Sequence, residues 1–143
     1  MDEIGNFRLT GNVIFAGVNN EGKKQISIEL SNEQIEALNK MIEAKFKENS
    51  YDSTPIKEMQ DGRIAFKSSS IYDVPCINED NEKDYEAFET LGVGSNITIF
   101  CNMKEVSYKR KHYIVSYLKS FTINNYIEKE EYNPFTDDSI LDL

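Results

Sequence analysis

Alternation of apolar and polar residues marks five segments of this chain as β-strands. Residues 23–30 alternate with a period of two, so that Ile26 and Ile28 share one face and polar side chains occupy the other. Residues 8–18 are rich in β-branched and aromatic residues, and a turn at residues 19–22 joins the two segments into a hairpin. The expected strands are residues 8–18, 23–30, 63–72, 95–103 and 112–125.

One segment departs from this alternation and has the spacing of a helix. Ser31 is a favourable N-cap, and Gln34 lies three residues later, where a capping box needs its second partner. Apolar residues follow at helical spacing, so we expect a helix from residue 31 to about residue 49. A second, short helix is expected near residues 84–90. The long connections are expected at residues 51–62, 77–90 and 105–111.

Five strands and one main helix predict a mainly β protein with a five-stranded, OB-fold-like barrel. The OB-fold is a small barrel that commonly binds oligonucleotides. In many OB-folds the helix lies between the third and fourth strands, whereas here it follows the second. The apolar pattern stops after residue 126. We therefore expect residues 1–126 to form the nucleic-acid-binding domain and residues 127–143 a flexible, disordered acidic tail.

Charge is distributed unevenly along the chain, whose 25 acidic and 16 basic residues give a net charge of −9. Residues 78–90 and residues 127–143 each contain six acids and one lysine, and the rest of the chain is nearly neutral. Residues 104–119 have the opposite bias, with five basic residues and one acid. A local basic patch can attract a polyanion even on an acidic protein.

The composition and the missing motifs exclude several classes of protein. No apolar run is long enough for a transmembrane helix, and the N-terminal residues lack the features of a signal peptide, so we expect a cytoplasmic protein without a membrane partner. We expect Cys76 and Cys101 to be buried free thiols, and with His112 they are too few for a four-ligand zinc site. Without a P-loop or nucleophile elbow, we expect no enzyme, no cofactor and no metal.

Residues 91–99, the basic turn and residues 113–123 resemble the OB-fold single-stranded DNA-binding proteins of bacteriophages. In that family a glycine–serine turn starts one strand of a closing hairpin, and the final strand leads to an acidic tail. Residues 133–143 resemble those tails, although this chain ends in Leu143 where phenylalanine is common. The resemblance implies a protein that coats single-stranded DNA without sequence specificity during phage replication, recombination or repair, in the host cytoplasm.

A nonspecific single-strand binder needs basic side chains for phosphates and flat side chains on which bases stack. The last hairpin interleaves the two kinds. If Ile97 and Ile99 face the core, Phe100 faces outward, because side chains alternate along a strand. An inward Leu118 likewise places Tyr117 on the outer face. The expected DNA-binding residues, the first two of which extend the groove onto the third strand, are Arg63, Lys67, Phe100, Tyr108, Lys109, Arg110, Lys111, Tyr113, Tyr117 and Lys119.

The predicted tail carries apolar side chains among carboxylates. Such a peptide can dock on a hydrophobic pocket with a basic rim, so we expect it to recruit replication or recombination proteins and to compete with DNA for the basic groove. The expected partner-binding residues are Phe135, Asp137, Asp138, Ile140, Leu141, Asp142 and Leu143. A homodimer is also compatible with the sequence.

The main alternative is a small acidic protein-interaction module, such as a DNA mimic or a regulatory or virion adaptor, that binds no nucleic acid. In that interpretation the acidic blocks carry the function, the tyrosines pack against neighbouring strands and the lysines keep the hairpin soluble. Clustered exposed cations favour DNA binding, and an unbroken acidic surface favours the alternative.

Overall fold

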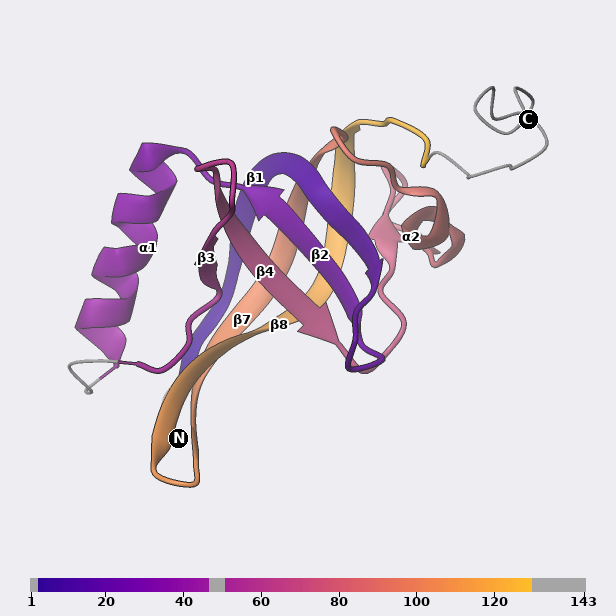
Figure 1. The fold of residues 1–143 in the computed structure, drawn as a ribbon. Helices are drawn as coiled ribbons and strands as arrows, with labels where there is room; N and C mark the ends of the chain where they lie inside the picture. The colour runs from indigo at the N-terminus through magenta and orange to yellow at the C-terminus, as the bar shows by residue number, and fades with distance from the viewer. Residues whose placement is uncertain (1–2, 47–50, 130–143) are drawn as a thin grey trace, which may run out of the picture.

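The computed structural model describes residues 3–46 and 51–129 (Figure 1). No helix in these ranges is long and apolar enough to cross a membrane. The elements they form are β1 (Glu3–Val18), β2 (Lys24–Glu29), α1 (Asn32–Lys45), β3 (Ile56–Glu58), β4 (Ile64–Ser70), β5 (Cys76–Ile77), β6 (Lys83–Asp84), α2 (Glu86–Thr90), β7 (Asn96–Tyr108) and β8 (Lys111–Asn125).

Five of these strands close into a barrel, which confirms the predicted fold. β1 pairs with β7 through its N-terminal part and with β2 through its C-terminal part, while β2 pairs with β4 and β7 pairs with β8. The barrel closes where β4 and β8 run parallel, with Ser69 opposite Tyr117. The hydroxyl groups of Ser68 and Ser116, 2.8 Å apart, form a buried hydrogen bond across this closure. The closure places the outer faces of β4 and β8 side by side.

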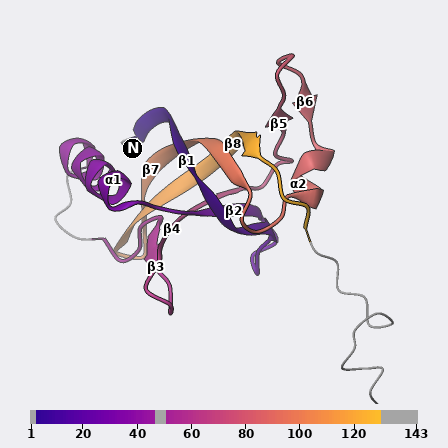
Figure 2. The same ribbon diagram turned by 90° about the horizontal axis from the view of Figure 1, so that it is seen from above.

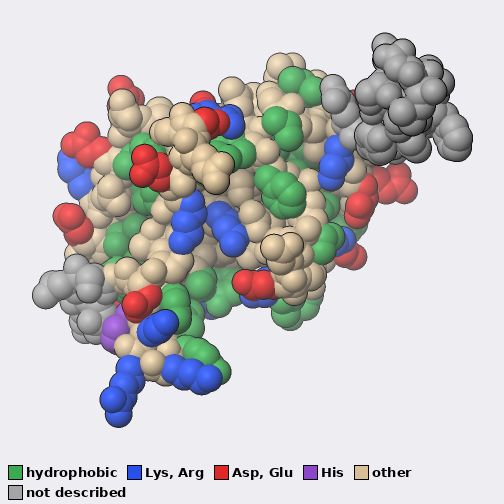
Figure 3. Space-filling model, in the orientation of Figure 1, with side chains coloured by type: hydrophobic (Ala, Val, Ile, Leu, Met, Phe, Trp, Pro, Cys, Tyr) green, Lys and Arg blue, Asp and Glu red, His purple; other side chains and the backbone are tan. Residues whose placement is uncertain are grey.

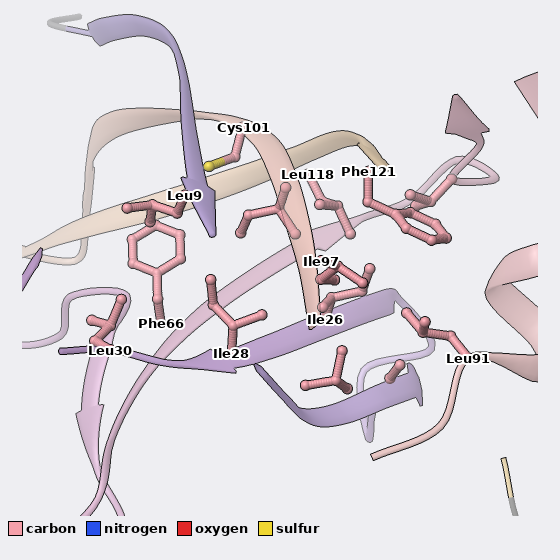
Figure 4. Close-up of a cluster of buried hydrophobic side chains, with 14 of the residues drawn as sticks. Leu9, Ile26, Ile28, Leu30, Phe66, Leu91, Ile97, Cys101, Leu118 and Phe121 are labelled. Atoms are coloured by element: carbon pink, nitrogen blue, oxygen red, sulfur yellow. The ribbon is translucent and has the colours of Figure 1, made fainter. Parts of the chain in front are cut away.

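The inward side chains of alternating strand positions fill the barrel. Figure 4 shows side chains from β1, β2, β4, β7 and β8 meeting between the walls. Burial of each large apolar side chain contributes about 1.5–3 kcal/mol to folding. The fully buried side chains include Ile26, Ile28, Phe66, Ile97, Ile99 and Phe121.

The main helix begins as the sequence predicted and ends earlier. The Gln34 amide donates to the Ser31 hydroxyl (3.2 Å) and the Ser31 amide donates to the Gln34 side chain (2.9 Å), which confirms the capping box. The helix ends at Lys45 rather than near residue 49, because Phe46 turns to an extended conformation (φ −104°, ψ 140°) and packs into the core.

The closing hairpin is longer than predicted. β7 continues to Tyr108 and β8 begins at Lys111, so the basic turn expected at residues 105–111 contains only Lys109 and Arg110. The end of this hairpin projects beyond the barrel (Figure 1). Polar side chains suit both faces of the strands there, so the alternation of apolar and polar residues is lost. Sequence periodicity therefore could not place the end of the strand.

Further differences are a first strand that begins at Glu3 rather than at residue 8, and short elements in or next to predicted loops. Residues 51–62 contain β3, and the acidic segment contains β5 and β6. α2 confirms the short helix predicted in that segment, and Figure 2 shows it beside β5 and β6 at the side of the barrel. Both cysteines are buried free thiols, as expected.

Candidate nucleic-acid interface

One face of the barrel is hollow because small side chains lie between larger ones. This face consists of the C-terminal part of β1 together with β2, β4 and β8. In one cross-strand row, Ser27 lies between Phe15 and Lys67, and in the next row Ser69 lies opposite Tyr117. Three adjoining hollows of about 220 to 430 Å³ result. We define the groove by lining residues that include Phe15, Lys23, Lys57, Lys67, Ser69, Tyr72, Lys104, Tyr117 and Lys119.

Aromatic rings flank the groove and remain open to solvent. Phe15 is 39% exposed, Tyr117 is 42% exposed and Tyr72, in the loop after β4, is 74% exposed. Three strand spacings separate Phe15 on β1 from Tyr117 on β8, which is about 14 Å at the usual interstrand distance. The Lys104 ammonium lies 5.5 Å from the centre of the Tyr117 ring. These rings are available for stacking against planar ligands.

The groove is basic although the protein is acidic. Five lysines line it, and among the described residues Glu21 is the one acidic side chain in its walls. Glu21 lies 3.3 Å from the Lys23 ammonium, so part of that lysine's charge is compensated. Figure 3 shows basic side chains at the middle of this face, over β3 and β4. The groove can therefore attract an anionic chain although the whole protein carries a net negative charge.

A second basic cluster lies at the end of the β7–β8 hairpin. Tyr108 is 61% exposed, and the Lys109 ammonium lies 5.2 Å from the centre of its ring. Lys109 (φ 50°) and Arg110 (φ 66°) form the two-residue turn in left-handed conformations. Asn-Gly is the usual sequence for such a turn, because these conformations strain other residues. The chain thus accepts local strain at a position where it presents two cations.

Replacing the turn by Asn-Gly (Lys109→Asn with Arg110→Gly) is expected to stabilise the fold and weaken DNA binding together. Relief of backbone strain should raise the unfolding free energy by about 1–3 kcal/mol. Loss of two cations should reduce the salt dependence of binding to single-stranded DNA. Thermal unfolding and binding at several salt concentrations measure the two effects. A variant that gains stability and keeps its affinity and salt dependence would exclude the hairpin end from the interface.

The structure brings three of the predicted residues into the groove, namely Lys67, Tyr117 and Lys119. Four more lie together at the hairpin end: Tyr108, Lys109, Arg110 and Lys111. Tyr113 lies on β8, next to Ser53 and between these two clusters.

The other two predicted residues lie outside the groove. Phe100 faces outward on β7 but lines none of the three hollows, and the Arg8 guanidinium lies over its ring at 5.1 Å, as Lys104 does over Tyr117. Arg63 approaches the carboxylates of Asp61 (2.7 Å) and Glu29 (3.7 Å), which compensate its charge.

Sequence reasoning missed Phe15, Tyr72, Lys23, Lys57 and Lys104 as groove residues. Regular alternation from the buried Val13 would have placed Phe15 inward, and a bulge in β1 between Val13 and Phe15 turns its ring outward instead. Because β1 is rich in apolar residues, Phe15 also resembled a core residue in the sequence. The pair Tyr72 and Lys57 comes from a loop and an edge strand, whose positions depend on tertiary structure alone.

The buried thiols are unsuited to nucleophilic chemistry. Burial raises the pKa of the Cys101 thiol to about 12, and burial also raises the pKa of Cys76. Both thiols therefore stay protonated and unreactive at neutral pH. Within residues 3–46 and 51–129, no group of His, Cys, Asp and Glu side chains could hold a metal ion.

The last described residues form a strap across the start of β7. The Gly92 amide donates to the Ile127 carbonyl oxygen (2.8 Å), and the Ile127 amide donates to the Ser95 hydroxyl (2.8 Å). The Lys129 ammonium donates to the Ala16 carbonyl oxygen (2.9 Å), next to Phe15 in sequence. Residues 127–129, which the sequence assigned to the tail, therefore lie against the barrel, with Lys129 beside β1. The seven predicted partner-binding residues of the tail lie outside the described residues.

Structural comparison identifies neighbours, although no family model and no curated protein matches the sequence. The single-stranded DNA-binding protein from bacteriophage Enc34 superimposes with a TM-score of 0.66 at 12% identity, covering 94% of this chain and 88% of the other. The same protein in complex with ssDNA gives 0.66 at 12% identity, covering 89% and 90%. The single-stranded DNA-binding protein gp2.5 of bacteriophage T7 gives 0.54 at 13% identity, covering 90% and 98%.

These matches extend over most of each chain, so they concern the whole architecture and not one motif. The chain has the fold of the phage OB-fold single-stranded DNA-binding proteins.

Proposed function

We propose that the protein coats single-stranded DNA without sequence specificity during phage DNA replication, recombination or repair, and that it is not an enzyme. The observation that carries this proposal is the groove, where exposed aromatic rings alternate with lysines on an otherwise acidic protein. Stacking on aromatic rings tolerates any base, and lysines contact the phosphates that every strand has. A neighbour of the same fold in complex with ssDNA supports the assignment. The host cytoplasm is the proposed location.

Fluorescence anisotropy tests this function. The full chain is titrated into a labelled oligo-dT and into a matched duplex, at low and at moderate salt. Binding to the single strand, weakened by salt as counterions are released, is the expected result. Equal affinity for the duplex, or no binding at either salt concentration, would contradict the proposal.

We further propose that the tail recruits replication or recombination proteins and competes with DNA for the groove. Residues 130–143 contain five acids and no base. They follow Lys129, which is bound to β1 beside the Phe15 end of the groove. Attachment to the same chain gives the tail a high effective concentration at a basic site. A homodimer remains a proposal that sedimentation can test.

Deleting residues 130–143 is expected to tighten binding to oligo-dT about 3- to 10-fold at low salt, because an attached competitor is removed. The deletion keeps the strap residues that the structure describes, up to Lys129. Moderate salt should reduce the difference, since it screens the tail from the groove. A control chain in which the five acids become Asn or Gln should bind as tightly as the deletion variant. Weaker binding after deletion would exclude competition.

The alternative function, an acidic protein-interaction module, draws support from the segment around β5, β6 and α2. Among the described residues, Glu79, Asp80, Glu82 and Glu86 form no ion pair. This module would leave oligo-dT unbound both in the full chain and after removal of residues 130–143. The basic groove favours the DNA-binding function over this one.

A further inference from the structure

Two lysines of the groove lie close together, and the one carboxylate among the described residues that line their hollow, that of Glu21, pairs with Lys23. Lys57 on β3 lies opposite Ala65 on β4, and Lys67 follows two residues later on the same outer face. Such diagonal neighbours have Cβ atoms about 7–8 Å apart, within reach of each other's long side chains. Among the described residues neither lysine forms an ion pair.

The surroundings of Lys57 fix its ammonium group in the groove. It donates to the Ser53 hydroxyl at 2.5 Å, and both lysines line the same hollow of about 220 Å³. Burial lowers the pKa of Lys57, and so does the positive charge of Lys67, because the two ammonium groups repel each other. An anion placed between them would replace this repulsion by two attractions.

The same hollow includes Tyr117, whose exposed ring offers a stacking surface. A nucleotide with its base on Tyr117 would occupy the hollow that both lysines line, within their reach. A phosphodiester carries one negative charge and two free oxygens, so it can accept from both ammonium groups. The small Ser69, opposite Tyr117, leaves room for the backbone.

We propose that Lys57 and Lys67 jointly bind one phosphate of the single strand, next to the base that stacks on Tyr117. This assignment rests on the proposed function and adds Lys57, which the sequence did not indicate, to its binding residues. We call the two lysines the phosphate seat.

The salt dependence of binding reports how many phosphates are neutralised at this seat. For single strands, the slope of log K against log salt changes by about 0.7 for each neutralised phosphate. The variant Lys57→Gln with Lys67→Gln should therefore flatten the slope for oligo-dT by about 0.7, although it loses two charges. Replacement of both lysines by arginine should keep the wild-type slope. Replacement of Lys40 and Lys45, on α1, by glutamine is the charge-matched control and should change nothing.

Each other outcome overturns the assignment. A flattening of about 1.4 would mean that the lysines contact two separate phosphates. An unchanged slope would mean that no phosphate lies at the seat. If the unmodified chain fails to bind oligo-dT, the proposed function itself fails, and this result is distinct from the other two. Circular dichroism of each variant confirms that the exposed substitutions leave the fold intact.

Discussion

Replacement of Tyr117 by alanine should weaken binding to oligo-dT about 5- to 150-fold, because stacking contributes about 1–3 kcal/mol for each base. Tyr117 lines two of the three hollows of the groove. Its ring also lies beside Lys104, so a stacked base would have a cation close by. Fluorescence anisotropy at low salt gives the change in Kd.

Two further variants make the Tyr117 result specific. Tyr117→Phe keeps the ring and should bind nearly as well as the original protein. Tyr85→Ala removes a ring of similar exposure, 48% against 42%, at the start of α2 and outside the groove. It should leave the affinity unchanged. If Tyr85→Ala weakens binding as much as Tyr117→Ala, the groove is not the DNA site.

Replacement of Gly92 by alanine should destabilise the fold by about 2–4 kcal/mol, because the strap must move. A Cβ atom at this position would lie 2.6 Å from the carbonyl oxygens of both Ile127 and Glu128. These are backbone atoms, so no side-chain rotation relieves the contact. Displacement of the strap breaks its hydrogen bonds to Gly92 and Ser95, each worth about 1 kcal/mol. Thermal or urea unfolding measures the loss.

Gly22→Ala is the matched control for Gly92→Ala. Gly22 lies in the turn between β1 and β2, where an added Cβ meets no atom within 4 Å. Its positive φ of 79° makes alanine unfavourable there, with an expected loss of about 1 kcal/mol. Gly92 and Ile127 line none of the three hollows of the groove, so Gly92→Ala should retain affinity for oligo-dT. A loss of stability no larger than that of Gly22→Ala would show that the strap contributes little.

The sequence predicted the barrel because its strands have one buried and one exposed face, which determines whether each side chain points inward or outward. This alternation alone placed Tyr117 and Phe100 on the outside correctly. It could not show that they point to different parts of the outer surface, because a barrel wall curves. Tyr117 on β8 lies next to β4 across the closure. Phe100 on β7 instead lies between β1 and Ser120 of β8.

The remaining groove residues depend on contacts between distant segments. The parallel pairing of β4 with β8 brings Lys67 next to Tyr117, and no local pattern encodes a parallel closure. Lys57 reaches the groove only because a three-residue edge strand docks on β4. Arg63 looked equivalent to Lys67 in the sequence, but local carboxylates compensate its charge.

The pairing of the first strand with β7 also determines when the barrel can form. Thr10 on β1 meets Thr98 on β7, which is 88 residues further along the chain. A polypeptide emerging from the ribosome can complete the β1–β2 hairpin and α1 early, yet β1 has no second neighbour until β7 follows. Contacts of such long range slow folding, since the loop must close before they form. The barrel, and with it the groove, is therefore completed only after nearly all of the domain has been synthesised.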